Sequence, residues 1–150
     1  MPNTKWSNLS SMQLGRYAEY FAKMEFTSYG FDVYTSEVDD HGVDFIAKNS
    51  NSVFYEIQVK STRNDNYAFI KKNKIVLDEN HLVCYIRFID GELPDCYVFP
   101  STVWNNPDGS LFSSRDYEGK KSAPEYGINV KNNLEKLTTY KIENTLSKIK

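Results

Sequence analysis

One segment of five residues contains three side chains suited to chemistry on a phosphate group. The segment is Glu56-Ile57-Gln58-Val59-Lys60. In an extended strand, Glu56, Gln58 and Lys60 share one face, and the two apolar residues share the other. A carboxylate, an amide oxygen and an ammonium group on one face could bind a divalent cation and a phosphate. The same pattern also fits an ordinary solvated strand face, which is the commoner role of Glu, Gln and Lys.

Two acids elsewhere in the chain could complete such a site. Asp44 lies in the strand-like segment 42–46, where an ionised carboxylate needs a partner, a metal ion or water, although a single acid often just marks a strand edge. Glu19 lies in a predicted helix. With Gln58 and Lys60, these acids give two carboxylates, one amide oxygen and one ammonium group, which is the inventory of metal-assisted phosphate hydrolysis.

The element that must position Glu19 is a predicted helix over residues 9–29. Ser10 or Ser11 can cap it, and Gly30 can end it. Apolar residues recur at steps of three and four and form one stripe: Leu14, Tyr17, Ala18, Phe21 and Ala22. At about 100° per residue, Glu19 falls at the edge of that stripe, from which its carboxylate could reach whatever the helix packs on.

Three strands are predicted next, over residues 31–38, 43–48 and 53–62. For Asp44 and Gln58 to share a face across the turn, the numbers of paired residues must sum to an even number, as when 44 lies opposite 58. A two-residue loop would pair 44 with 57 and turn the acid toward the core. We therefore predict a longer loop or a bulge in this hairpin.

The remaining elements are less regular. Residues 68–80 are ambiguous, and a short helix is one option, because Lys71-Lys72-Asn73-Lys74 interrupts any clean period. Strands are predicted over residues 81–89 and 96–100, with a possible short helix at 101–104. Residues 110–125 look like a loop, and residues 132–140 favour a terminal helix that could extend to residue 149.

Length and composition indicate one soluble folded domain spanning residues 1–150, with a basic C-terminal helical segment from about residue 126. The chain has no apolar run of the roughly 20 residues that cross a bilayer and no secretory stretch, so a cytoplasmic location is expected. The net charge of −2 gives no support to a broad basic face, but residues 119–150 carry +4 and residues 1–118 carry −6.

Taken in order, four short motifs resemble the PD-(D/E)XK nuclease superfamily. They are Gly15-x-x-x-Glu19, Gly30-Phe31, Gly42-Val43-Asp44 and Gln58-Val59-Lys60. The helix pattern is similar to that of archaeal-type Holliday junction resolvases. The glutamine strand motif, followed by Ser61-Thr62-Arg63, is similar to certain intron homing endonucleases and to a transposase subunit. The resemblance covers about residues 12–63, and four motifs in the right order are rarer than any one of them.

The resemblance implies an α/β, restriction endonuclease-like fold, with an N-terminal helix packed on a central mixed β-sheet in the order αβββαβ. It implies a metal-dependent endonuclease that hydrolyses DNA phosphodiester bonds with Mg²⁺ or Mn²⁺. Asp44, Gln58 and the Val59 carbonyl would bind the metal, Glu19 would assist through a second metal or water, and Lys60 would be the catalytic lysine. The sequence departs from the family pattern in two ways. Glutamine replaces the commoner acid at position 58, and Glu56 on the same face could compensate for the lost negative charge. The proline that names the family is absent.

DNA is the implied partner, and a homodimer or higher homo-oligomer is expected, because cutting both strands of a duplex takes two active sites related by symmetry. Arg63, Lys71, Lys72 and Lys74 are candidate nucleic-acid contacts, although a charge run is usually a solvated face. Two other functions stay open. One is a catalytically inactive nuclease-fold module that binds nucleic acid or protein partners, and the other is an interaction domain without a nucleic acid partner.

Overall fold

The computed structural model describes residues 1–35 and 42–150. The elements, in chain order, are η1 (Trp6–Asn8), α1 (Ser11–Ser28), β1 (Asp32–Thr35), β2 (Phe45–Lys48), β3 (Phe54–Arg63), β4 (Ala68–Lys71), η2 (Lys72–Lys74), β5 (His81–Phe88), β6 (Asp95–Pro100), η3 (Ser101–Trp104), β7 (Phe112–Arg115), β8 (Glu125–Ile128), α2 (Leu134–Thr138) and α3 (Ile142–Ile149). The label η marks a short 3₁₀ helix.

The ends of α1 follow from its sequence. The Ser10 hydroxyl accepts a hydrogen bond from the Gln13 N–H, and the Gln13 side chain accepts one from the Ser10 N–H, which makes a capping box. At the other end, Gly30 has a φ of +89°, and the Phe31 N–H bonds the Phe26 carbonyl, as in a Schellman motif. The predicted helix is therefore confirmed, with Ser10 as its cap.

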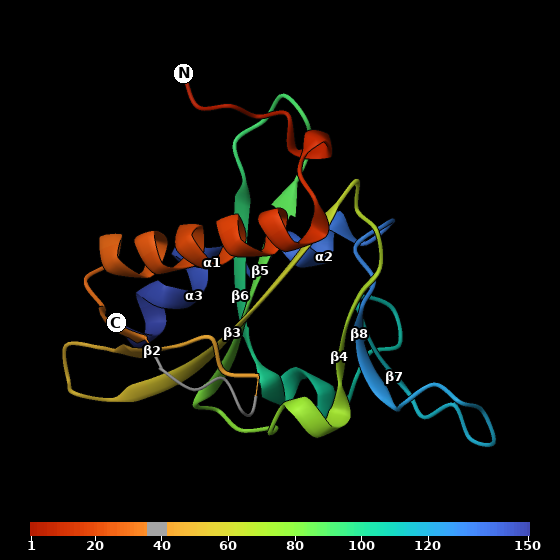
Figure 1. Ribbon diagram of the computed structural model, residues 1–150. Helices are drawn as coiled ribbons and strands as arrows, with labels where there is room; N and C mark the ends of the chain where they lie inside the picture. The colour runs from red at the N-terminus through yellow and green to blue at the C-terminus, as the bar shows by residue number, and fades with distance from the viewer. Residues whose placement is uncertain (36–41) are drawn as a thin grey trace.

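A five-stranded mixed sheet, in the order β1-β2-β3-β5-β6, lies at the centre. Only β3 and β5 pair in parallel, and the other neighbours are antiparallel. In Figure 1, α1 crosses in front of the long strands. Its stripe of Leu14, Ala18, Ala22 and Phe26 joins the strands and α3 in one buried cluster. The predicted fold class, a helix packed on a mixed sheet, is confirmed. The first predicted strand, over residues 31–38, is described only to residue 35, and residues 36–38 lie outside the described residues.

A second, three-stranded sheet has the order β4-β8-β7 and stands at the right in Figure 1. With η3 and α2, it covers the other face of β5 and β6 through a second buried cluster that includes Val83, Tyr85, Phe99 and Trp104. The β5–β6 pair therefore lies between two layers.

The connection between β3 and β5 corrects the predicted order αβββαβ. Instead of an α-helix, residues 64–80 contain β4 and the short η2. Ala68 and Ile70 are buried, whereas Phe69 and Lys71 are exposed. Alternation of buried and exposed residues is typical of a strand. Here it covers only four residues next to a run of lysines, which is too short to be recognised in the sequence.

Two predictions for the C-terminal third also change. Residues 112–115 and 125–128, expected to be loop or helix, form β7 and β8, and the first helix after them begins at Leu134. The end of the chain packs against the body: Leu137, Ile142 and Leu146 are buried, and the Thr145 hydroxyl donates to the Val98 carbonyl. No described helix is long and apolar enough to span a membrane.

The β2–β3 hairpin has the predicted register. Phe45 lies opposite Ile57, so the ladder places Asp44 at the level of Gln58. The loop is longer than two residues, as predicted: the Asn49 N–H bonds the Val53 carbonyl, and Ser52 has a φ of +61°. The Asn49 side chain accepts hydrogen bonds from the N–H groups of Asn51 and Val53. One buried asparagine thus organises the loop that sets the register.

Candidate functional site

The site begins where β2 stops covering β3. Pairing between these strands ends at Phe45 and Ile57, whereas the pairing of β3 with β5 continues to Arg63. Beyond Ile57, no strand among the described residues pairs with this edge of β3. At the level of Gln58 and Lys60, this edge of β3 is therefore not covered by a paired strand in the part of the chain that the structure describes.

Asp44 bonds to this edge. The Asp44 N–H donates to the Ile57 carbonyl at 2.8 Å, and an Asp44 carboxylate oxygen accepts from the Val59 N–H at 2.7 Å. In an extended strand, the N–H and the carbonyl of one residue point to the same side. The Val59 carbonyl therefore also points toward Asp44 and away from β5.

A pocket of about 360 Å³ lies at this edge. It is lined by residues from α1, the segment just before β2, β3 and the β4–η2 segment: Glu19, Gly42, Asp44, Gln58, Val59, Lys60, Phe69, Ile70, Lys71 and Lys74. We refer to it as the β3 pocket. The residues predicted for catalysis, Glu19, Asp44, Gln58 and Lys60, all line it, as does Val59. Distant segments of the chain thus meet at one place, as the sequence pattern predicted.

Gln58 is buried, and Lys60 is half-buried. Gln58 is 8% exposed. Burial lowers the pKa of Lys60 from its ordinary value, and the nearby negative charge of Asp44 opposes that shift. A half-buried lysine whose pKa is shifted by burial and by a nearby acid is typical of functional sites, although ion pairs in the fold shift pKa values too.

Gly42 closes one wall of the β3 pocket. Its φ of +78° is a conformation that side chains disfavour, and a Cβ atom there would lie 2.7 Å from the Lys74 carbonyl oxygen and 3.1 Å from the Gln58 side-chain nitrogen. Only glycine permits this close approach. The sequence offered Gly42 as part of a motif, but its contact with η2 depends on a crossover that the sequence did not predict.

The charge of the β3 pocket differs from that of the whole chain. Two acids, Glu19 and Asp44, face three cations, Lys60, Lys71 and Lys74. The chain as a whole carries −2. The three lysines could offset the negative charge of a phosphate, even though the chain as a whole is acidic.

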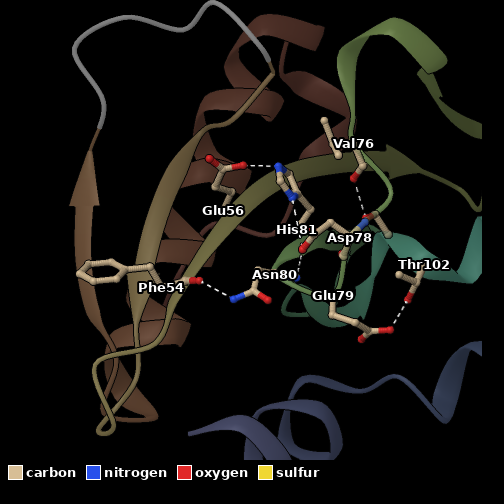
Figure 2. A network of polar contacts seen from close by, with 9 residues as sticks. Phe54, Glu56, Val76, Asp78, Glu79, Asn80, His81 and Thr102 are labelled. Carbon is tan, nitrogen blue, oxygen red and sulfur yellow. Dashed lines mark hydrogen bonds and ion pairs between the residues drawn. The ribbon is translucent and has the colours of Figure 1, made fainter.

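Glu56 does not line the β3 pocket. Its carboxylate forms an ion pair with His81 at the start of β5, as Figure 2 shows. His81 also lies 3.9 Å from Asp78, and Asn80 donates to the Phe54 carbonyl. This network joins β3 to the segment before β5. The expectation that Glu56 compensates for the neutral Gln58 is therefore not supported by its position.

Two predicted nucleic-acid contacts have partners within the chain. The Arg63 guanidinium donates to the carbonyls of Trp6 and Leu9 at 2.9 Å and 2.8 Å, and it anchors the N-terminal segment. Lys72 bonds Ser114 and Asp116, both at 2.6 Å, and packs on the Tyr126 ring. These two hydrogen bonds give Arg63 a structural role, and its contact with nucleic acid stays a prediction. The sequence could not reveal carbonyl partners more than 50 residues away.

The donors of the β3 pocket fit a hard, hydrated cation. Glu19 and Asp44 offer carboxylates, Gln58 an amide oxygen and Val59 a carbonyl. Across residues 1–35 and 42–150, no group of three or more His, Cys, Asp and Glu side chains could hold a metal ion. A site here therefore depends on amide and backbone oxygens. Mg²⁺ keeps several waters, so two or three protein oxygens are enough.

The fold is similar to those of two solved nuclease structures. The Holliday junction resolvase Hjc of Archaeoglobus fulgidus aligns at 12% sequence identity over 77% of this chain and 83% of its own, with a TM-score of 0.48. A bacterial homing endonuclease aligns at 23% identity over 63% of this chain and 72% of its own, with a TM-score of 0.46. No protein-family model and no curated protein matches the sequence. The likeness is one of fold, so a function must be argued from the pocket.

Proposed function

We propose that the chain is a metal-dependent endonuclease that hydrolyses DNA phosphodiester bonds with Mg²⁺ or Mn²⁺. The observation that supports this function is the meeting of Glu19, Asp44, Gln58 and Lys60 in one pocket with two further lysines at its wall. Each of these side chains alone has an ordinary structural explanation. Their convergence from α1, β3 and the segment just before β2 is what favours a catalytic site.

In this proposal, Asp44, Gln58 and the Val59 carbonyl hold the cation, and Glu19 assists directly or through water. A divalent cation supplies Lewis acidity beside the scissile phosphate. Lys60 orients the attacking water or offsets the negative charge that builds on the phosphate in the transition state. Lys71 and Lys74 hold the flanking phosphates. Cleavage of both strands of a duplex would use a homodimer or a larger assembly.

The neutral Gln58 favours a second candidate, a catalytically inactive module of the same fold. Replacing an acid by an amide lowers the negative charge available to a cation and weakens the expected metal affinity. Such a module would bind nucleic acid or a protein partner without cutting DNA.

Plasmid cleavage in the presence of Mn²⁺ tests the endonuclease. Wild-type protein should relax and linearise supercoiled DNA, and Asp44→Ala or Lys60→Ala should lower the rate on the order of a hundredfold or more. Lys48→Ala is the matched control, because Lys48 pairs with Asp32 and does not line the β3 pocket. Cleavage by Asp44→Ala at the wild-type rate would disprove the proposal. Binding of DNA without cleavage would favour the inactive module.

A further inference from the structure

The outer face of the second sheet carries an aromatic and basic surface. Phe69 of β4 lies opposite Gly127 of β8, which lies opposite Ser113 of β7. In the next row, Lys71 lies opposite Glu125, and Glu125 lies opposite Arg115. Side chains alternate along a strand, so these rows point away from the core that Ala68, Ile70, Phe112 and Ile128 form. We refer to these two rows, with Tyr67, as the outer face.

Glycine at position 127 lets an aromatic ring lie across this face. A Cβ atom there would lie 2.7 Å from Cε1 of Tyr67 and closer still to the hydroxyls of Tyr67 and Ser113. The Tyr67 hydroxyl donates to Glu125, which fixes the ring. The rings of Tyr67 and Phe69 lie nearly parallel, with an interplanar angle of 19° and centroids 6.1 Å apart. The pair is therefore held in a defined orientation.

The exposed charges beside these rings are positive. The Arg115 guanidinium lies 4.7 Å from the centroid of the Tyr67 ring, and Lys71 is exposed at the other end of its row. Glu125 lies between them, but it is only 6% exposed and takes the Tyr67 hydrogen bond. The solvent-facing part of the row is therefore cationic.

The outer face is continuous with the β3 pocket. Phe69 is 44% exposed, and both Phe69 and Lys71 line the β3 pocket as well. Exposed apolar side chains that form part of such a surface mark binding sites more often than scattered ones do. A ligand bound on the outer face would extend directly into the pocket.

We propose that the outer face binds an unpaired stretch of nucleic acid, with a base stacked on Phe69 and with phosphates near Lys71 and Arg115. This inference rests on the proposed function for the claim that the strand continues into a cleavage site. Single strands are bound by aromatic rings that stack on bases and by cations along the backbone. The faces of paired bases are covered by their neighbours in a duplex, so an exposed ring gains little there. The structure thus points to single-stranded or locally unpaired DNA as the preferred substrate.

Fluorescence anisotropy with the full-length chain tests this inference. The probes are a labelled thymidine oligonucleotide of about 12 nucleotides, within the usual site size of single-strand binders, and a labelled duplex of equal length, both in Ca²⁺ to suppress cleavage. Wild-type protein should bind the single strand more tightly. Phe69→Ala and Phe69→Leu should each weaken that binding about 5- to 100-fold, and Phe69→Trp should retain it.

Phe54→Ala is the matched control, because Phe54 is 55% exposed on the first sheet and lies outside the outer face. It should bind the oligonucleotide like wild type, and circular dichroism should show that all variants are folded. Unchanged affinity in Phe69→Leu, or an equal loss for single strand and duplex, would overturn the inference. So would a change in oligomeric state without a change in binding, which would assign the face to a second copy of the chain.

The two proposals fail in different ways. If wild-type protein cuts plasmid and Lys60→Ala does not, while every Phe69 variant binds like wild type, only the outer-face inference is wrong. If the oligonucleotide binds through Phe69 but no metal supports cleavage, the endonuclease is wrong and the binding surface stands.

Discussion

Lys60 lines the β3 pocket, where burial lowers its pKa and the negative charge of Asp44 offsets that effect only in part. A lowered pKa means that the charged form costs more in the folded protein than in the unfolded chain. At neutral pH the folded protein therefore carries Lys60 at a net cost in stability. A residue of this kind is best explained by its chemistry.

Replacement of Lys60 by Met should separate stability from activity. Lys60→Met keeps the length of the side chain and removes the charge, so we expect a higher Tm than wild type at pH 7 and no cleavage. The cost in the wild type is present below the lowered folded pKa, and it is relieved as the pH rises toward the ordinary value of 10.5. The gap in Tm, measured by thermal unfolding at several pH values, should therefore narrow with rising pH. A Met variant that is less stable at pH 7 would refute this account of Lys60.

Gly42 makes a second prediction at the scale of one residue. Gly42→Ala should lower stability by about 1 to 3 kcal/mol from its positive φ alone, and contact of the new Cβ with the Lys74 carbonyl adds to that loss. It should also displace Gln58 and weaken metal binding. Thermal unfolding with and without Mn²⁺ measures both effects.

Gly15 provides the matched control for Gly42. Gly15 lies in the second turn of α1, and a Cβ atom there would meet no described atom within 4 Å outside its chain neighbours and the helix backbone. Gly15→Ala should therefore raise stability by about 0.5 to 1 kcal/mol through helix propensity. A loss of stability in Gly15→Ala equal to that in Gly42→Ala would contradict the close packing inferred around Gly42.

At the scale of elements, the β2–β3 hairpin decides whether Asp44 reaches the edge of β3. Its register depends on Asn49, which is buried, accepts two backbone hydrogen bonds inside the loop and donates one to the Ile149 carbonyl at 2.7 Å. The same side chain thus fixes the loop and ties the end of α3 to it.

Loss of the Asn49 side chain should destabilise the hairpin. We expect Asn49→Ala to cost about 2 to 3 kcal/mol, since three hydrogen bonds of a buried residue are lost. Asn51→Ala, at an exposed position of the same loop, should change stability by no more than about 0.5 kcal/mol. Urea unfolding of both variants measures the difference, and equal values for the two would contradict the role assigned to Asn49.

The sequence predicted best those elements in which an apolar pattern repeats over many residues or a capping residue marks an end. Ser10, the stripe from Leu14 to Ala22, and Gly30 mark both ends and one face of α1, and the alternation around Gln58 marks β3. The strands β4, β7 and β8 have four residues each, so a period of two is too short to detect in them. They are fixed instead by pairing with one another and by burial against β5 and β6.

The same reasoning explains which site residues were predicted. Asp44, Gln58 and Lys60 follow from strand alternation and an even register, which are local properties. Glu56 and Arg63 lie on the same strand, but their partners, His81 and the carbonyls of Trp6 and Leu9, come from distant segments. The sequence around Phe69 gives no sign that this residue lines the pocket, because its position depends on the β3–β5 crossover.

At the scale of the whole molecule, the two sheets contribute different residues to the β3 pocket. The first sheet and α1 supply the acids, the amide and Lys60, whereas the crossover through β4 and η2 supplies Lys71, Lys74 and Phe69. This division also accounts for the charge. The chain is acidic as a whole, but its lysines are unevenly placed. Lys71 and Lys74 line the β3 pocket, whereas Lys72 and Lys136 are paired with Asp116 and Asp108.

The central claim is that Asp44, Gln58 and the Val59 carbonyl bind a divalent cation with the help of Glu19. The most direct measurement is the change in Tm on addition of Mg²⁺ or Mn²⁺, compared between wild type, Asp44→Asn and the control Asp32→Asn, whose acid is exposed and lies outside the β3 pocket. At a metal concentration of about 100 times Kd, binding should stabilise wild type and Asp32→Asn by about 2.7 kcal/mol, and Asp44→Asn by almost nothing. An equal rise in all three proteins, or no rise in wild type at millimolar metal, would contradict the claim.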